Sequence, residues 1–232
     1  MKRISKLLLV LLAVLLLVGC GKKQEEVKDE LPKPEVSEGI RGELGIDKNI
    51  NESNIDDYLG REDAVYRDMR MLIDPANYGA MEDQGGDAYL SGFIKGFEVV
   101  PLPYIMNVTG LPEIVGNTYQ GKTLFTQNED GTFTANYEES MDILEYLFPK
   151  DKVIFLMCGG GGYAGMTKGL LVANGWNADK IYNVGGYWYY NGKNKIEVKR
   201  ENGKEVSYDF WKVPYHNIDF KTLHEVKKWK SV

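Results

Sequence analysis

Between residues 138 and 184 the sequence alternates helix and strand patterns, and this alternation constrains the fold more than any other feature. One amphipathic segment ends at Pro149 and a second segment ends at Gly175, as expected of two helices. Each is followed by a short apolar run with the character of a strand. This order predicts an α/β fold in which crossover helices flank a parallel sheet. The expected elements are a helix over 138–148, a strand over 152–156, a helix over 164–174 and a strand over 180–184.

The chain on either side of this unit gives weaker signals. Residues 51–59 predict a short capped helix, and residues 64–70 and 97–100 predict two more strands. Residues 103–135 are rich in Gly, Asn and Thr and are interpreted as an insertion or a lid. Residues 195–210 alternate around an Asn-Gly turn, which predicts a C-terminal β-hairpin extension.

The N-terminus has the pattern of a targeting segment. Basic residues precede the apolar run Leu7–Val18, which is too short to span a bilayer comfortably but fits the core of a signal peptide. The stretch ending in Gly19-Cys20 resembles the bacterial lipobox, whose cysteine becomes the lipidated first residue of the mature protein. An ordinary secretory signal with an incidental cysteine is the alternative. We expect a lipoprotein signal peptide over 1–19 and a lipid anchor at Cys20, which would place the protein on the membrane facing the periplasm or the exterior.

Residues 20–49 are charged, contain two prolines and hold few large apolar side chains, so they are expected to form a disordered tether. The main domain is then expected over 50–192, with the hairpin and C-terminal tail over 193–232. The formal charge is −6, and the chain beyond residue 19 keeps 25 basic against 34 acidic residues. A body this acidic is a poor partner for nucleic acid.

Cys158 stands between a predicted buried strand and the start of a predicted helix. If Cys20 is lipidated, Cys158 has no disulfide partner. The dipole and free N–H groups at a helix N-terminus favour a thiolate, so we expect the pKa of Cys158 to lie below that of free cysteine. Four glycines follow it, and their N–H groups can form an anion-binding nest. The alternative is an inert buried cysteine in a tight turn.

Four motifs of this chain resemble, in the same order, those of the rhodanese-like domains, a sulfurtransferase superfamily. They are Asp68-Met69-Arg70, Tyr89–Gly96 followed by Val100-Pro101, the loop Cys158–Tyr163, and Gly175–Trp188. In that family the active-site cysteine begins a six-residue loop between a central strand and a helix, and it carries sulfur as a persulfide. The resemblance covers roughly residues 50–192 and implies a rhodanese-like parallel sheet flanked by helices, to which the C-terminal hairpin is appended.

The resemblance implies that Cys158 is the sulfur-accepting nucleophile and that the N–H groups of the loop hold the persulfide. Asp68 and Arg70 would support the site from the neighbouring strand end, and Gly185 and Gly186 would close the fold behind the last core strand. The residues of the implied cradle are Gly159, Gly160, Gly161, Gly162 and Tyr163.

Two positions depart from the family pattern. Sulfur-transferring members often carry an arginine or lysine at the sixth loop position, which recognises an anionic donor such as thiosulfate, whereas this chain has Tyr163 and an uncharged loop. The lost contact is worth about 1.5–3 kcal/mol, so efficient use of thiosulfate is not expected. The family's histidine after Gly92 is Phe93 here, which is expected to pack. The short loop without arginine also argues against the phosphatase chemistry of related scaffolds.

Other chemistries fit the residues less well. Cys158 with His216 or His224 could form a thiol-hydrolase dyad, but both histidines lie in the tail and are expected to be surface residues. The loop lacks the Lys-Ser/Thr of a phosphate-binding Walker A motif. The aromatic run Tyr187–Tyr190 is interpreted as packing rather than a ligand platform. No His or Cys cluster has metal-ligand spacing, and no metal or other cofactor is expected.

Two functions remain open from the sequence. The chain could be a membrane-anchored sulfurtransferase or persulfide carrier, whose partners are a small sulfur donor and an acceptor thiol. It could instead be a catalytically silent rhodanese-like binding module on the cell surface. Retention of Cys158 favours the enzyme, the uncharged loop favours the binding module, and we favour the enzyme.

Overall fold

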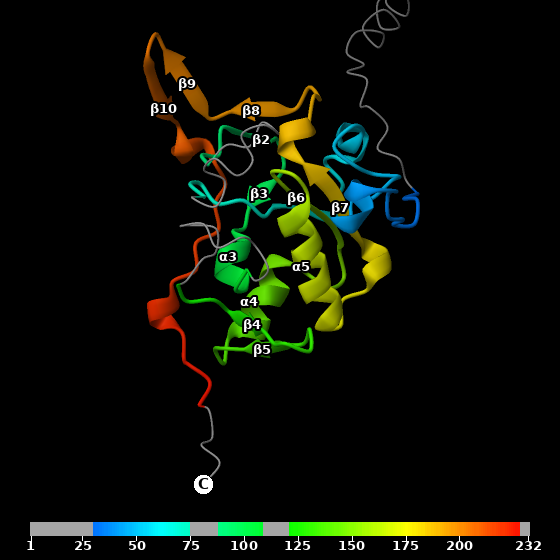
Figure 1. Cartoon of the computed structure of the whole chain (residues 1–232), viewed down its shortest axis with the longest axis vertical. Helices are drawn as coiled ribbons and strands as arrows, with labels where there is room; N and C mark the ends of the chain where they lie inside the picture. Colours follow the sequence, from blue (N-terminus) through cyan, green and yellow to red (C-terminus); the bar gives the residue numbers. More distant parts are fainter. Residues whose placement is uncertain (1–29, 75–87, 109–120, 228–232) are drawn as a thin grey trace, which may run out of the picture.

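A computed structural model describes residues 30–74, 88–108 and 121–227 of the chain (Figure 1). Its centre is a four-stranded parallel sheet in the order β3-β1-β6-β7. The α/β class with a parallel sheet and flanking helices is therefore confirmed. The strands of this sheet are β1 (Ala64–Asp68), β3 (Glu98–Val99), β6 (Val153–Cys158) and β7 (Ile181–Gly186).

The two faces of the sheet are covered by different parts of the chain, because side chains alternate along β6. Leu156 and Cys158 belong to a buried cluster with side chains of α4 (Ser140–Leu147) and α5 (Gly162–Ala173). Phe155 and Met157 point to the opposite face and pack with residues 50–58 and with aromatic residues after β7. Figure 1 shows α5 lying along β6 and β7. Cys158 is thus on the helix-covered face.

The predicted strand over 152–156 is longer in the structure, so that Cys158 is the last residue of β6 rather than the first loop residue. The predicted helices over 138–148 and 164–174 correspond to α4 and α5. The helix expected over 51–59 is shorter and is a 3-10 helix, η1 (Ile55–Tyr58).

The tether prediction for residues 20–49 is wrong over its described part, because residues 30–49 are folded. They contain helix α2 (Ile40–Glu43), and Val36 pairs with Asp47. The side chains of Ile46 and Asp47 are buried, and the backbone N–H of Asp47 donates to Asn183 O at 2.8 Å. The charged composition of this segment led to the wrong prediction, since only a few apolar side chains anchor it. The signal peptide and Cys20 lie outside the described residues.

The C-terminal extension is built into the domain. Strand β8 (Lys195–Glu197) pairs with β2 (Gly92–Ile94), and the predicted hairpin is present as β9 (Lys199–Asn202) and β10 (Glu205–Tyr208). Figure 1 shows this hairpin projecting from one end of the body. The chain then passes β3, where His216 N–H donates to Val99 O at 2.8 Å.

The described part of the segment 103–135 packs against the helix-covered face rather than standing free. Its apolar residues Ile105, Met106, Leu124 and Phe125 are all buried in the cluster that contains Cys158. Among the described residues, no helix is both long enough and apolar enough to cross a membrane. The remaining elements are α3 (Leu102–Ile105), β4 (Phe125–Gln127), β5 (Phe133–Ala135), η4 (Ala178–Lys180), η5 (Tyr187–Tyr189), η6 (Phe210–Lys212) and η7 (Phe220–Thr222).

Candidate active site around Cys158

The carboxyl ends of three parallel strands bring the predicted site residues to one edge of the sheet. The register places Asp68 of β1 beside Met157, and Cys158 of β6 beside Gly186 of β7. In open α/β sheets this edge is where ligands bind and reactive groups collect. The structure therefore brings together Asp68, Cys158 and Gly186, as the sequence motifs implied.

The loop after Cys158 turns directly into α5 and directs backbone N–H groups at the sulfur. Gly161 has a φ of +107°, in the left-handed region that favours glycine, and its N–H donates to Cys158 Sγ at 3.0 Å. The backbone N–H groups of Tyr163 and Ala164 also lower the pKa of the Cys158 thiol. The sulfur thus faces the N-terminus of a twelve-residue helix, where the free N–H groups and the helix dipole favour negative charge.

The first part of the implied cradle has a different role. The Trp188 indole occupies the space that a Cβ on Gly159 would need, and it lies 3.4 Å from the equivalent position on Gly160. The backbone N–H of Trp188 also donates to Gly159 O at 3.2 Å. Gly161 of the predicted cradle therefore donates to the sulfur, and the N–H groups of Tyr163 and Ala164 act on it electrostatically, while Gly159 and Gly160 pack under Trp188.

Cys158 is only 4% exposed, and this burial reverses the expected direction of its pKa shift. Burial raises the pKa of the Cys158 thiol above its ordinary value, and the nearby Asp68 carboxylate adds to the rise. The N–H groups of Ala164, Gly161 and Tyr163 lower the pKa but do not offset the burial. The expectation of a pKa below that of free cysteine is therefore wrong, because it took account of the helix dipole and not of the packing over the loop.

Asp68 and Arg70 form a buried ion pair beside the site. The Arg70 Nε donates to Asp68 Oδ1 at 2.9 Å, and the side chains are 7% and 0% exposed respectively. Arg70 Nη2 also donates to Gly92 O at 2.8 Å, and the guanidinium lies 4.4 Å from the centre of the Tyr187 ring. Arg70, Gly92 and Tyr187 belong to three of the four motifs of the family resemblance, so these motifs meet here. The Arg70 guanidinium is bound by groups of the protein itself.

The sixth loop position is Tyr163, at which sulfur-transferring rhodanese-like domains often carry an arginine or lysine. Its hydroxyl is bound to a carboxylate. Tyr163 Oη donates to Asp74 Oδ2 at 3.0 Å. Burial raises the pKa of Tyr163, and the Asp74 carboxylate raises it further, so the phenol keeps its proton. The site therefore has an acidic rather than a basic neighbour at this position.

The thiol-hydrolase alternative finds no support in the geometry. His216 Nε2 lies 2.8 Å from Glu98 Oε2, and His224 Nδ1 is bound to Glu139, so both rings are engaged with carboxylates. Phe93 is 5% exposed and packs in a small cluster of its own, as predicted. In the described ranges, no group of three or more His, Cys, Asp or Glu residues is placed to hold a metal ion.

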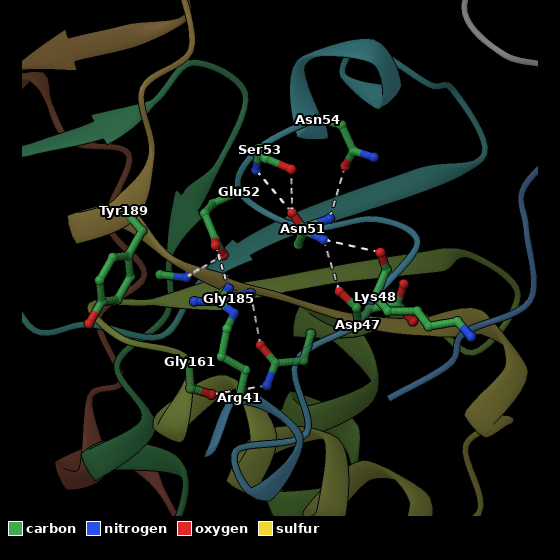
Figure 2. A network of polar contacts seen from close by, with 12 residues as sticks. Arg41, Asp47, Lys48, Asn51, Glu52, Ser53, Asn54, Gly161, Gly185 and Tyr189 are labelled. Atoms are coloured by element: carbon green, nitrogen blue, oxygen red, sulfur yellow. Dashed lines mark hydrogen bonds and ion pairs between the residues drawn. The ribbon is translucent and has the colours of Figure 1, made fainter. Parts of the chain in front are cut away.

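The sequence did not point to the N-terminal segment, which supports the loop from behind. Gly186 N–H donates to Glu52 Oε2 at 3.3 Å, and Glu52 is in turn paired with Arg41, whose guanidinium lies 5.6 Å from the centre of the Tyr189 ring. Figure 2 shows the pair of Arg41 and Glu52 close to Gly185. No local sequence signal could have indicated the contact of Glu52 with Gly186, because these residues are 134 positions apart.

Comparison of the chain with models of protein families, with curated proteins and with solved structures gave no match. The function is therefore argued below from the motifs and the geometry of the site.

Proposed function

We propose that this protein is a rhodanese-like domain that carries sulfane sulfur as a persulfide on Cys158. The observation that carries the proposal is the junction between β6 and α5, where the Gly161 N–H donates to Cys158 Sγ and the N–H groups of Tyr163 and Ala164 also lower the pKa of the thiol. Such an array favours a negative sulfur species, whether the thiolate or the persulfide formed on it. The supporting motif residues Asp68 and Arg70 lie at the neighbouring strand end.

The proposed reaction needs no cofactor and no net oxidation. The Cys158 thiolate attacks the outer sulfur of a donor R–S–SH, the donor S–S bond breaks, and R–S⁻ leaves and takes a proton from solvent. A new S–S bond gives Cys158–S–SH. An acceptor thiol or cyanide then takes the outer sulfur and returns the Cys158 thiolate.

Because burial raises the pKa of Cys158, the rate of sulfur uptake is expected to increase with pH through the neutral range.

The surroundings of the loop favour a donor without a double negative charge. Arg70 is bound to Asp68 and to the carbonyl of Gly92, and Tyr163 presents a hydroxyl held by Asp74. A donor such as thiosulfate would meet carboxylates here and no cation on the loop. We therefore propose a neutral or thiol-derived persulfide as the donor, and an acceptor thiol as the partner.

The place of this chemistry is also part of the proposal. The signal pattern over 1–19 and the lipobox cysteine Cys20 favour export and lipid anchoring, with the domain outside the cytoplasm. The folded part begins no later than residue 30, so at most ten residues separate it from Cys20. On this proposal the domain works close to the membrane surface.

Replacing Tyr163 tests the donor preference. We expect the wild-type protein to take up sulfur from a neutral alkyl persulfide much faster than from thiosulfate, and Tyr163→Arg to raise the thiosulfate rate about tenfold relative to the neutral donor. Tyr163→Phe is the matched control, because it removes the hydroxyl and adds no charge. Sulfur uptake would be followed by intact mass, with Cys158→Ser as the blank. Equal wild-type rates from the two donors would contradict the proposed preference.

A silent binding module is the second candidate, and one observation favours it. Cys158 is only 4% exposed, and the Trp188 indole lies over the first two glycines of the loop. If the thiol never reaches a donor, the loop could bind a ligand through its N–H groups but could not take up sulfur. Absence of sulfur uptake from every donor, in a protein shown to be folded, would favour this candidate.

A further inference from the structure

Asn183 lies on β7 next to the Cys158 loop and is completely buried. Its Nδ2 donates to Gly161 O at 3.0 Å and to Leu44 O at 2.8 Å, and its Oδ1 accepts the N–H of Gly185 at 3.0 Å. A buried amide with three such bonds has little freedom to rotate. One side chain therefore joins the loop, the strand behind it and the N-terminal segment.

The residue that Asn183 holds is the one whose N–H reaches the sulfur. Gly161 donates its N–H to Cys158 Sγ, while its carbonyl accepts from Asn183 and from Gly165 N–H at 3.0 Å in the first turn of α5. Ile46 limits the same glycine from the other side, since a Cβ there would lie 2.7 Å from Ile46 Cδ1. The orientation of Gly161 is thus determined by contacts from outside the loop.

We infer that Asn183 is a positioning residue, which keeps the Gly161 N–H directed at Cys158 Sγ and couples the loop to the N-terminal segment through Leu44. The inference rests on the proposed function only in taking Cys158 as the reactive group. The charged or titratable groups that interact with Cys158 are Asp68 at the end of β1, Arg70 just beyond it and Tyr163 on α5. Asn183 hydrogen-bonds to none of these in the described structure, so a neutral substitution acts on the thiol through the backbone.

The test measures the reactivity of Cys158 rather than its turnover. The full chain carrying Cys20→Ser, purified in detergent, has Cys158 as its single thiol, and its alkylation by iodoacetamide is followed against pH. The wild-type loop is expected to give an apparent pKa above the roughly 8.5 of free cysteine. Asn183→Leu, which is neutral and of similar shape, is expected to raise it by about one unit, so that alkylation near neutral pH slows about tenfold. Asn183→Ser serves as a second variant if the leucine substitution does not fold.

Tyr182→Phe is the matched control. Tyr182 is the neighbouring residue on β7, and its hydroxyl donates to Pro32 O at 2.6 Å, so the substitution also loses a bond to the N-terminal segment but none to the loop. Its alkylation profile is expected to match the wild type. Unchanged or faster alkylation in both Asn183 variants would overturn the inference. A shifted profile in a protein that takes up no sulfur would instead leave the inference standing and refute the proposed function.

Discussion

Replacing Arg70 with methionine is expected to lower the free energy of unfolding by about 3–5 kcal/mol, because it leaves the Asp68 carboxylate buried without its partner. Asp68 is 0% exposed, and Arg70 is its bidentate partner through Nε and Nη2. The same substitution removes a donor from the Gly92 carbonyl. Urea denaturation of the two proteins would measure the difference.

Two comparisons separate this effect from the general cost of losing an arginine. Arg200→Met also breaks an ion pair, with Asp209, but Arg200 is 64% exposed, so a change of at most about 1 kcal/mol is expected. The double variant Asp68→Asn with Arg70→Met removes the stranded charge and is expected to recover a large part of the stability. An Arg70→Met protein as stable as the wild type would show that the pair does not hold the strand ends together.

Replacing Ile46 with alanine is expected to lower the free energy of unfolding by about 2–5 kcal/mol, although the sequence places this residue in a charged linker. Ile46 is 1% exposed and packs against Gly161 at the start of α5. The loss follows from the apolar contacts that disappear and from the cavity that remains. Thermal or urea unfolding would measure it.

Ile40→Ala is the matched control, since Ile40 lies in the same segment and is 77% exposed. Its effect is expected to stay within about 0.5 kcal/mol of the wild type. If Ile46→Ala were equally neutral, residues 30–49 would behave as the disordered tether that their composition suggests.

The central part of the fold could be predicted from the sequence because its signals are local. The apolar run before Cys158, the caps at Pro149 and Gly175 and the order of elements gave the βα units of the sheet. The composition of residues 30–49 was misleading, because one buried isoleucine, Ile46, and one buried aspartate, Asp47, hold the end of that segment among many charges. Local composition does not reveal which few side chains will find a partner elsewhere in the chain.

The candidate site was predictable in its residues but not in its electrostatics. The motifs placed Cys158, Asp68 and Arg70 together, and the structure agrees on their positions. The predicted direction of the pKa shift of Cys158 was wrong, because the burial of the thiol arises from packing by several distant elements. The roles of Asp74 and Asn183 were not predicted for the same reason, since they depend on contacts between separate strands and loops. Trp188 was expected to pack, but its position over the loop glycines could not be predicted.

The central claim is that Cys158 accepts a sulfur atom, and intact mass spectrometry tests it most directly. The full chain with Cys20→Ser would be incubated at about pH 8.5, near the pKa of a free thiol, with an alkyl persulfide whose alkyl group carries no charge. The protein is expected to gain one sulfur atom, which should be absent in Cys158→Ser and lost again on addition of cyanide. A folded protein that gains no sulfur, or gains it equally without Cys158, would contradict the account.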